Sequence, residues 1–158
     1  MKALAFATAS VLASKDKFPS FSWMHAHCEM TVPAGMDCTS AYVQLKQLTD
    51  TSSDPASPPG HYDAKESGDN DYVWTVRTTA NGQYKDDVIF EFSEDGDNQC
   101  YIHARSQSQS LSYLDNNVNF CNMFNIIKQV DSSIAGGQGY KVGQCKAGQS
   151  DYTACGRY

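Results

Sequence analysis

Residues 84–93 read Tyr-Lys-Asp-Asp-Val-Ile-Phe-Glu-Phe-Ser, and this stretch decides the fold. Apolar side chains recur at every second position, at Val88, Phe90 and Phe92. Alternate residues of a β-strand point to the same face, so these three side chains are expected to share one buried face. The strand therefore needs a second layer of structure that covers this face.

A second strand is expected after the acidic turn at residues 94–98. Its inward-facing residues are small or apolar, namely Cys100, Ile102 and Ala104. Its outward-facing residues are Tyr101, His103 and Arg105. Upstream, residues 61–66 and 72–79 also read as strands, and Asn81-Gly82 is typical of a hairpin turn. The four segments together predict an antiparallel meander.

Three further elements complete the expected fold. Residues 23–32 alternate between an inward set that includes Met24 and an outward set that includes His25 and His27, which predicts a strand. Asp37 is placed to cap a helix whose buried stripe is Cys38, Ala41, Leu45 and Leu48. Asp115 is placed to cap a second helix whose stripe is Phe120, Met123, Phe124, Ile127 and Val130. The expected fold class is α+β: a curled antiparallel sheet in the order strand-helix-meander-helix, with two helices on one face and a Gly-rich, disulfide-closed C-terminal tail.

Composition limits the function classes. The 158 residues include 12 Lys and Arg against 18 Asp and Glu, which gives a formal net charge of -6. A nucleic-acid partner is excluded because no basic stripe is present to neutralise phosphates. No apolar run approaches the ~20 residues of a membrane-spanning helix, so no membrane span is expected.

The chain divides into three regions. Residues 1–13 have a positive start, an apolar stretch and a small-residue end, which predicts a signal peptide that is cut after Ala13. Residues 21–131 are expected to form the α+β domain, and residues 134–158 form a tail rich in Gly and Tyr. An even number of cysteines behind such a leader predicts a secreted protein with disulfides.

All six cysteines are expected in disulfides: Cys28, Cys38, Cys100, Cys121, Cys145 and Cys155. Cys145 and Cys155 are close in sequence and are expected to pair with each other, which would close a small loop in the tail. The other four allow three pairings, and the sequence does not choose among them.

No catalytic constellation is found, since the chain has neither a Gly-x-Ser-x-Gly elbow nor a Cys-x-x-Cys pair. No catalytic residue and no cofactor are therefore predicted. His25 and His27 are weak candidates for metal ligands, with His103 expected on the same outer face, but most solvent-facing histidines on strands bind no metal.

One segment, residues 105–125, is unusually rich in short polar side chains. Structurally, these groups satisfy backbone atoms at a strand end and a helix start. Functionally, they would line a polar pocket between sheet and helix. The candidate binding residues of that pocket are Arg105, Ser106, Ser108, Asp115, Asn119 and Asn122.

Several of these residues also carry a resemblance. Residues 86–92, 102–108, Asp115 and Asn119 resemble the core pattern of an uncharacterised bacterial and plastid family, domain of unknown function fourteen-ninety-nine. Residues 21–23 and the run from Ser106 to Asn122 are also similar to small secreted cysteine-containing proteins of algae and other protists. Neither group implies an activity.

The expected function is a secreted, non-enzymatic structural or interaction module whose partner is another protein or a copy of itself. The tail would make that contact rather than complete the core, through Tyr140, Tyr152 and Tyr158. An alternative is that the tail lies along a sheet edge and protects it. The alternative function is a binding protein for a small apolar or amphipathic ligand between sheet and helix, and an enzyme ranks third.

Overall fold

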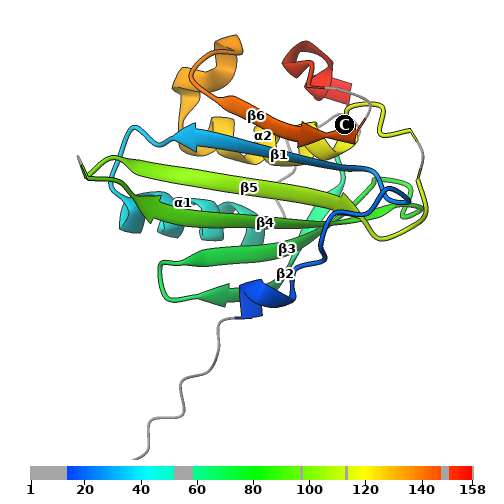
Figure 1. Ribbon diagram of the computed structural model, residues 1–158, viewed down its shortest axis with the longest axis horizontal. Helices are drawn as coiled ribbons and strands as arrows, with labels where there is room; N and C mark the ends of the chain where they lie inside the picture. The colour runs from blue at the N-terminus through cyan, green and yellow to red at the C-terminus, as the bar shows by residue number, and fades with distance from the viewer. Residues whose placement is uncertain (1–13, 52–58, 97, 113, 147–149, 158) are drawn as a thin grey trace, which may run out of the picture.

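The structure, a computed structural model, describes residues 14–51, 59–96, 98–112, 114–146 and 150–157. Six antiparallel strands form one open sheet in the order β2-β3-β4-β5-β1-β6 (Figure 1). The strands are β1 (His27–Pro33), β2 (His61–Gly68), β3 (Tyr72–Thr78), β4 (Lys85–Glu94), β5 (Cys100–Ser108) and β6 (Lys141–Cys145). The helices are α1 (Cys38–Asp50), α2 (Val118–Val130) and the short 3-10 turns η1 (Ser14–Lys17), η2 (Ser132–Gly136) and η4 (Tyr152–Arg157).

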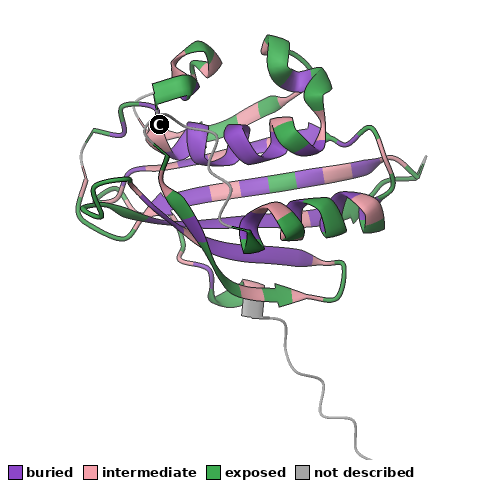
Figure 2. Cartoon of the chain, turned by 180° about the vertical axis from the view of Figure 1, so that it is seen from behind, coloured by how far each residue is buried: buried purple, intermediate pink, exposed green. Residues whose placement is uncertain are grey.

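Both α-helices cover the same face of the sheet, and the face of α2 seen in Figure 2 is largely buried. The α+β fold with a curled antiparallel sheet is thus confirmed. None of the helices in the described ranges is long and apolar enough to cross a membrane. The predicted signal peptide, residues 1–13, lies outside the described residues.

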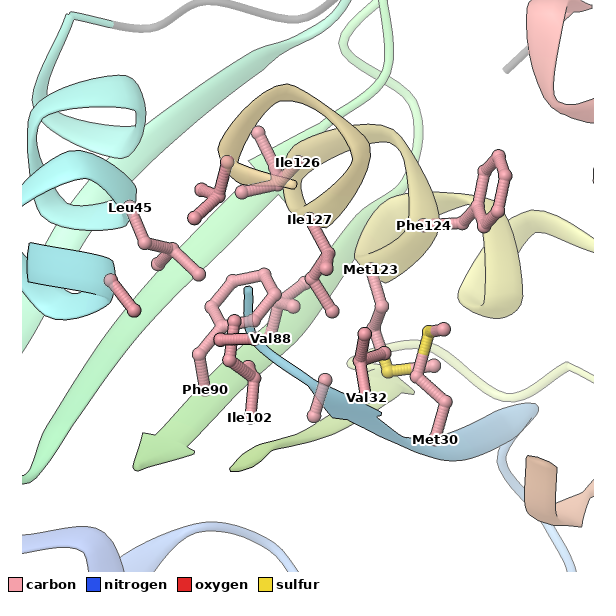
Figure 3. Close-up of a cluster of buried hydrophobic side chains, with 14 of the residues drawn as sticks. Met30, Val32, Leu45, Val88, Phe90, Ile102, Met123, Phe124, Ile126 and Ile127 are labelled. Atoms are coloured by element: carbon pink, nitrogen blue, oxygen red, sulfur yellow. The ribbon is translucent and has the colours of Figure 1, made fainter. Parts of the chain in front are cut away.

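The strand register builds one continuous apolar face. Phe90 lies opposite Val73 on β3 and opposite Ala104 on β5, so the three side chains share the side that faces the helices. Leu45 of α1 and Ile127 of α2 point toward Phe90 from above the sheet (Figure 3). The inward strand face with Phe90 and Phe92 and the helix stripe with Phe120 and Phe124 belong to one core cluster, so the predicted second layer over this face is confirmed.

A second, smaller cluster fills the opposite face of the sheet. Phe18, just after η1, packs with Trp74 at a ring distance of 5.5 Å and joins Tyr72 and Ile89. This cluster explains why β4 carries Ile89 as well as Phe90, since both faces of the strand are covered. No cluster on this face was predicted from the sequence.

Strand β1 is shorter than the predicted 23–32. It begins at His27, and Met24 is 41% exposed rather than directed inward. The chain turns at this point, because the His25 backbone N–H donates to Ser22 O at 3.1 Å. The alternation of apolar and polar residues therefore continues upstream of the strand, through residues 23–26, which lie outside β1.

The two helix starts differ. Asp37 is the N-cap of α1, as predicted, and its Oδ1 accepts from the Ser40 N–H at 2.9 Å. The N-cap of α2 is Asn117 and not the predicted Asp115. Asp115 lies two residues earlier, yet its Oδ1 accepts from the Asn119 N–H at 3.1 Å, so it still serves the first turn of the helix.

The three disulfides are Cys28–Cys145, Cys38–Cys100 and Cys121–Cys155. The predicted pairing of Cys145 with Cys155 is therefore wrong, although no cysteine in the described ranges is free. Pairing of β6 with β1 brings Cys145 opposite Cys28. The η4 turn contacts α2, which brings Cys155 beside Cys121. Proximity in sequence was a poor guide because both tail cysteines lie in elements that dock elsewhere.

The tail completes the core, contrary to the sequence-based expectation. Ile134 and Cys155 are buried in the main cluster. The Tyr140 ring lies 5.9 Å from that of Phe124, and the Tyr152 ring lies 6.0 Å from it. β6 forms the edge strand beside β1, which is the arrangement of the alternative hypothesis. Tyr158 lies outside the described residues.

Replacement of Phe90 tests the core. Phe90→Ala is expected to lower the free energy of unfolding by ~3–5 kcal/mol, because a fully buried ring is lost and a cavity remains. Urea unfolding measures the change. Val43→Ala is the control: Val43 is 54% exposed on α1, so a change within ~0.5 kcal/mol is expected. Equal small effects of both substitutions would contradict the register.

Tryptic mapping under non-reducing conditions tests the disulfides. Cleavage after Lys and Arg should give one species that joins peptides 18–46, 86–105 and 142–146, since the first peptide carries both Cys28 and Cys38. A second species should join peptides 106–128 and 147–157 through Cys121 and Cys155. A peptide pair of 142–146 with 147–157 would show the Cys145–Cys155 bridge instead.

Candidate functional site

A cavity of about 380 Å³ lies where one end of β4 and β5 meets the chain that leads into α2. Its walls mix carboxylates, hydroxyls and apolar side chains. The lining residues are Thr79, Tyr84, Asp86, Ser108, Ser110, Ser112, Leu114, Asp115, Asn116 and Val118. A neighbouring hollow of about 190 Å³ shares Thr79, Tyr84 and Val118 and adds Arg77 and Arg157.

Asp86 comes from β4, on the same face as Val88 and Phe90. It is 2% exposed. Its Oδ1 accepts a hydrogen bond from Ser108 Oγ at 2.7 Å, and its Oδ2 accepts from Asn122 Nδ2 at 2.9 Å. The buried carboxylate of Asp86 on β4 is thus held by side chains from the end of β5 and from α2.

Asp115 comes from the segment before α2 and is 3% exposed. Its Oδ1 accepts twice from Asn119, from the backbone N–H at 3.1 Å and from Nδ2 at 2.6 Å. Its Oδ2 is buried and has no hydrogen-bond partner among the described residues. Asp115 therefore presents one satisfied and one unsatisfied oxygen beside the cavity.

Serine and asparagine side chains link the two carboxylates. Asn119 Nδ2 lies 2.6 Å from Asp115 Oδ1 and 3.3 Å from Ser108 Oγ, which in turn donates to Asp86. Ser106 Oγ donates to Asn119 Oδ1 at 2.7 Å and accepts from Asn122 Nδ2 at 3.2 Å. The result is one buried hydrogen-bond network that joins β4, β5 and α2.

Burial raises the pKa of both carboxyl groups, because the charged form loses its hydration. For Asp86, the hydrogen bonds from Ser108 and Asn122 and the charge of Arg77 oppose this rise. For Asp115, the hydrogen bonds from Asn119 oppose it, whereas the charge of Asp86 adds to it. The site thus concentrates two carboxyl groups that ionise less readily than surface carboxylates.

The rim of the cavity is apolar. Leu114 is 68% exposed and Tyr84 is 57% exposed, and the partly buried Val118 lies between the cavity and the neighbouring hollow. Exposed large apolar side chains at the mouth of a polar cavity are suited to a molecule with one polar end and one apolar end.

Five of the six predicted binding residues come together in the hydrogen-bond network: Ser106, Ser108, Asp115, Asn119 and Asn122. Of these, Ser108 and Asp115 line the cavity. Arg105 does not join them. It points to the opposite face of β5, where its guanidinium contacts Glu91 at 2.9 Å and lies over the Phe18 ring. The reason is the two-residue period of the strand, which sends Arg105 and Ser106 to opposite faces.

Sequence reasoning missed Asp86, the carboxylate at the centre of the network. The signal was present, because Asp86 continues the inward series of Val88, Phe90 and Phe92 by one step of two residues. A carboxylate in line with an apolar face is unusual and indicates either a partner or a function. Tyr84 and Thr79 were missed because only the bend after β3 brings them to the cavity.

The histidines do not assemble a metal site. Nδ1 of His25 hydrogen-bonds to Ser108 O at 2.9 Å, and Nδ1 of His27 to His25 O at 3.0 Å. His103 lies between Thr31 and Ser93. Within the described residues, no group of three or more His, Cys, Asp or Glu side chains is arranged to hold a metal ion.

Comparison with known proteins identifies one family. Residues 15–130 match the family described as "Protein of unknown function (DUF1499)". The match includes Asp86 and Asp115 and ends at the last residue of α2, before the tail. No curated protein and no solved structure matches the chain.

The raised pKa of Asp115 predicts a pH dependence of stability. Folding raises this pKa above its ordinary value of 3.8, so the native state binds more protons than the unfolded state above that pH. Stability from this group is therefore present below pH 3.8 and is lost as the pH rises through the folded-state pKa. Asp115→Asn keeps an acceptor for Asn119 and removes the titration.

We expect the stability of Asp115→Asn relative to wild type to increase from about pH 4 upward, as measured by urea unfolding at a series of pH values. Carboxylates that do not interact with Asp115 cancel in the difference, and loss of the mutual repulsion lets Asp86 ionise more readily in the variant, which acts in the same direction. If the free energy of unfolding of Asp115→Asn instead falls relative to that of wild type as the pH rises, folding lowers the pKa of Asp115.

Proposed function

We propose that this chain, which belongs to the DUF1499 family, is a binding protein for a small amphipathic ligand held between the sheet and α2. The observation that carries the proposal is the cavity of about 380 Å³, whose floor contains the buried carboxylates and whose rim is apolar. Small-molecule sites are commonly clefts of roughly 300–1,000 Å³ with a few convergent polar groups.

The two halves of the site have different tasks. Asp86, Ser108 and Asp115 offer fixed polar atoms that would orient the polar end of a ligand. Leu114, Val118 and the Tyr84 ring offer apolar surface that the rest of the ligand would cover. Removing this surface from water supplies binding free energy of roughly 25 cal/mol per Å².

The fold favours this function over self-assembly through the tail. Tyr140 and Tyr152 pack against Phe124 and are partly buried, so their rings are less available as interface anchors than the sequence suggested. Asn117 Oδ1 also accepts from the Asp151 N–H at 2.9 Å, which ties the tail to the start of α2. Assembly through the tail remains the second candidate function, with Tyr158 as its anchor.

We also propose that the protein acts in an oxidising compartment, such as the extracellular space. Three disulfides join segments that are distant in sequence, and such bridges persist where glutathione does not reduce them. Secretion through the leader at residues 1–13 is the route that the sequence predicts.

Binding of the neutral dye N-phenyl-1-naphthylamine tests the proposal. Its fluorescence is expected to rise when wild-type protein is added and to saturate, because the dye leaves water for an apolar site. Ser110→Trp, which places an indole in the cavity wall, should abolish the saturable signal. Ser132→Trp on η2, an exposed serine outside the cavity lining, is the matched control and should bind like wild type.

Saturable binding that survives Ser110→Trp would place the dye elsewhere. Absence of saturable binding to the wild-type protein, together with concentration-dependent assembly that is lost on removal of Tyr158, would favour the tail function.

A further inference from the structure

We propose that the ligand is an amphipathic primary amine whose ammonium group binds Asp115 Oδ2 inside the cavity. This inference rests on the proposed function, because it assigns the chemistry of the polar end of that ligand.

The unsatisfied atoms of the buried network are acceptors. Asp115 Oδ2 and Asn122 Oδ1 are both buried and have no hydrogen-bond partner among the described residues. A buried acceptor without a donor costs free energy, so the site is complementary to a group that donates. Asp115 is 3% exposed and is one of the residues that line the cavity, so its unpaired oxygen belongs to a side chain of the cavity wall.

The charges select a cation over an anion. Arg77 of β3 lies opposite Asp86 in the register, and its charge opposes the rise that burial causes in the pKa of that carboxyl. The groups that act on Asp115 are Asn119 of α2, Asp86 of β4 and, at longer range, His27 of β1. Arg157 of η4 lines the neighbouring hollow instead. An ammonium group would supply the positively charged partner that the Asp115 carboxylate lacks. A carboxylate on the ligand would instead be repelled by Asp86 and Asp115.

A primary amine fits better than a quaternary one. Asp115 Oδ2 offers a hydrogen-bond acceptor, which a trimethylammonium group cannot use. Quaternary ammonium groups are instead recognised by several aromatic faces, and among the described residues that line this cavity Tyr84 is the single aromatic one. Leu114 and Val118 provide the wall for an alkyl or aryl body attached to the amine.

Isothermal titration with a matched set of ligands tests the inference. Decylamine, decyltrimethylammonium, 1-decanol and decanoate share one alkyl chain and differ only at the head, and all are used as monomers below micelle formation at neutral pH. Decylamine is expected to bind at least about tenfold tighter than 1-decanol, since a hydrogen bond to a charged group contributes roughly that factor. Decyltrimethylammonium and decanoate should bind more weakly than decylamine.

Variants assign the preference to Asp115. Asp115→Asn should bring decylamine binding down to the level of 1-decanol in the same variant, so that the preference for the amine is lost. Asp69→Asn removes the same charge at an exposed site in the β2–β3 turn, outside the cavity lining, and should retain the preference. Ser110→Trp should abolish binding of every ligand in the set, which separates the cavity from adsorption elsewhere.

Each outcome decides between the two proposals. Equal or tighter binding of 1-decanol, decyltrimethylammonium or decanoate in the cavity overturns the amine inference and leaves the proposed function standing. A preference for decylamine that persists in Asp115→Asn also overturns the inference. Absence of binding by all four ligands overturns both. If Asp115→Asn does not fold, the wild-type comparison of the four head groups decides alone.

Discussion

The packing of α2 on the inward face of β4 and β5 is the contact on which the rest of the structure depends. Along most of its length this contact is apolar, with Ile127 directed at Phe90 (Figure 3). Over its first two turns the contact becomes polar, with Asn122 bound to Asp86 and Asn119 to Ser106. One helix therefore closes the core and builds the floor of the cavity, so the position of the site is set by the same register that sets the core.

The tail depends on this contact as well. Once α2 is seated, Cys121 and Asn117 are fixed at its start, and they hold Cys155 and Asp151 of the tail. At the β6 edge of the sheet, the bridge from Cys28 to Cys145 holds β6 against β1. Long-range bridges of this kind stabilise mainly by restricting the unfolded chain. With these two bridges in place, a Gly-rich segment with no apolar period forms the edge strand of the sheet and covers part of the core.

The buried polar network is costly for folding, and this cost is informative. Burial disfavours the charged forms of Asp86 and Asp115, and Asp115 Oδ2 is left without a donor in the described structure. Apolar residues of similar size at these positions would avoid both penalties. Strained or unsatisfied groups that cluster beside a cavity are typical of sites at which function outweighs stability.

Sequence alone determined the helices and strands, because their periods of 3.6 and two residues are local patterns. The meander, the N-cap of α1 at Asp37 and the inward direction of Phe90 all follow from residues that are neighbours in the chain. It also identified Ser106, Ser108, Asp115, Asn119 and Asn122 as a polar set. Only the tertiary structure decided which residues meet across elements. The disulfide partners, the exclusion of Arg105 and the entry of Asp86 depend on strand register and helix seating, which are set by contacts between residues far apart in sequence.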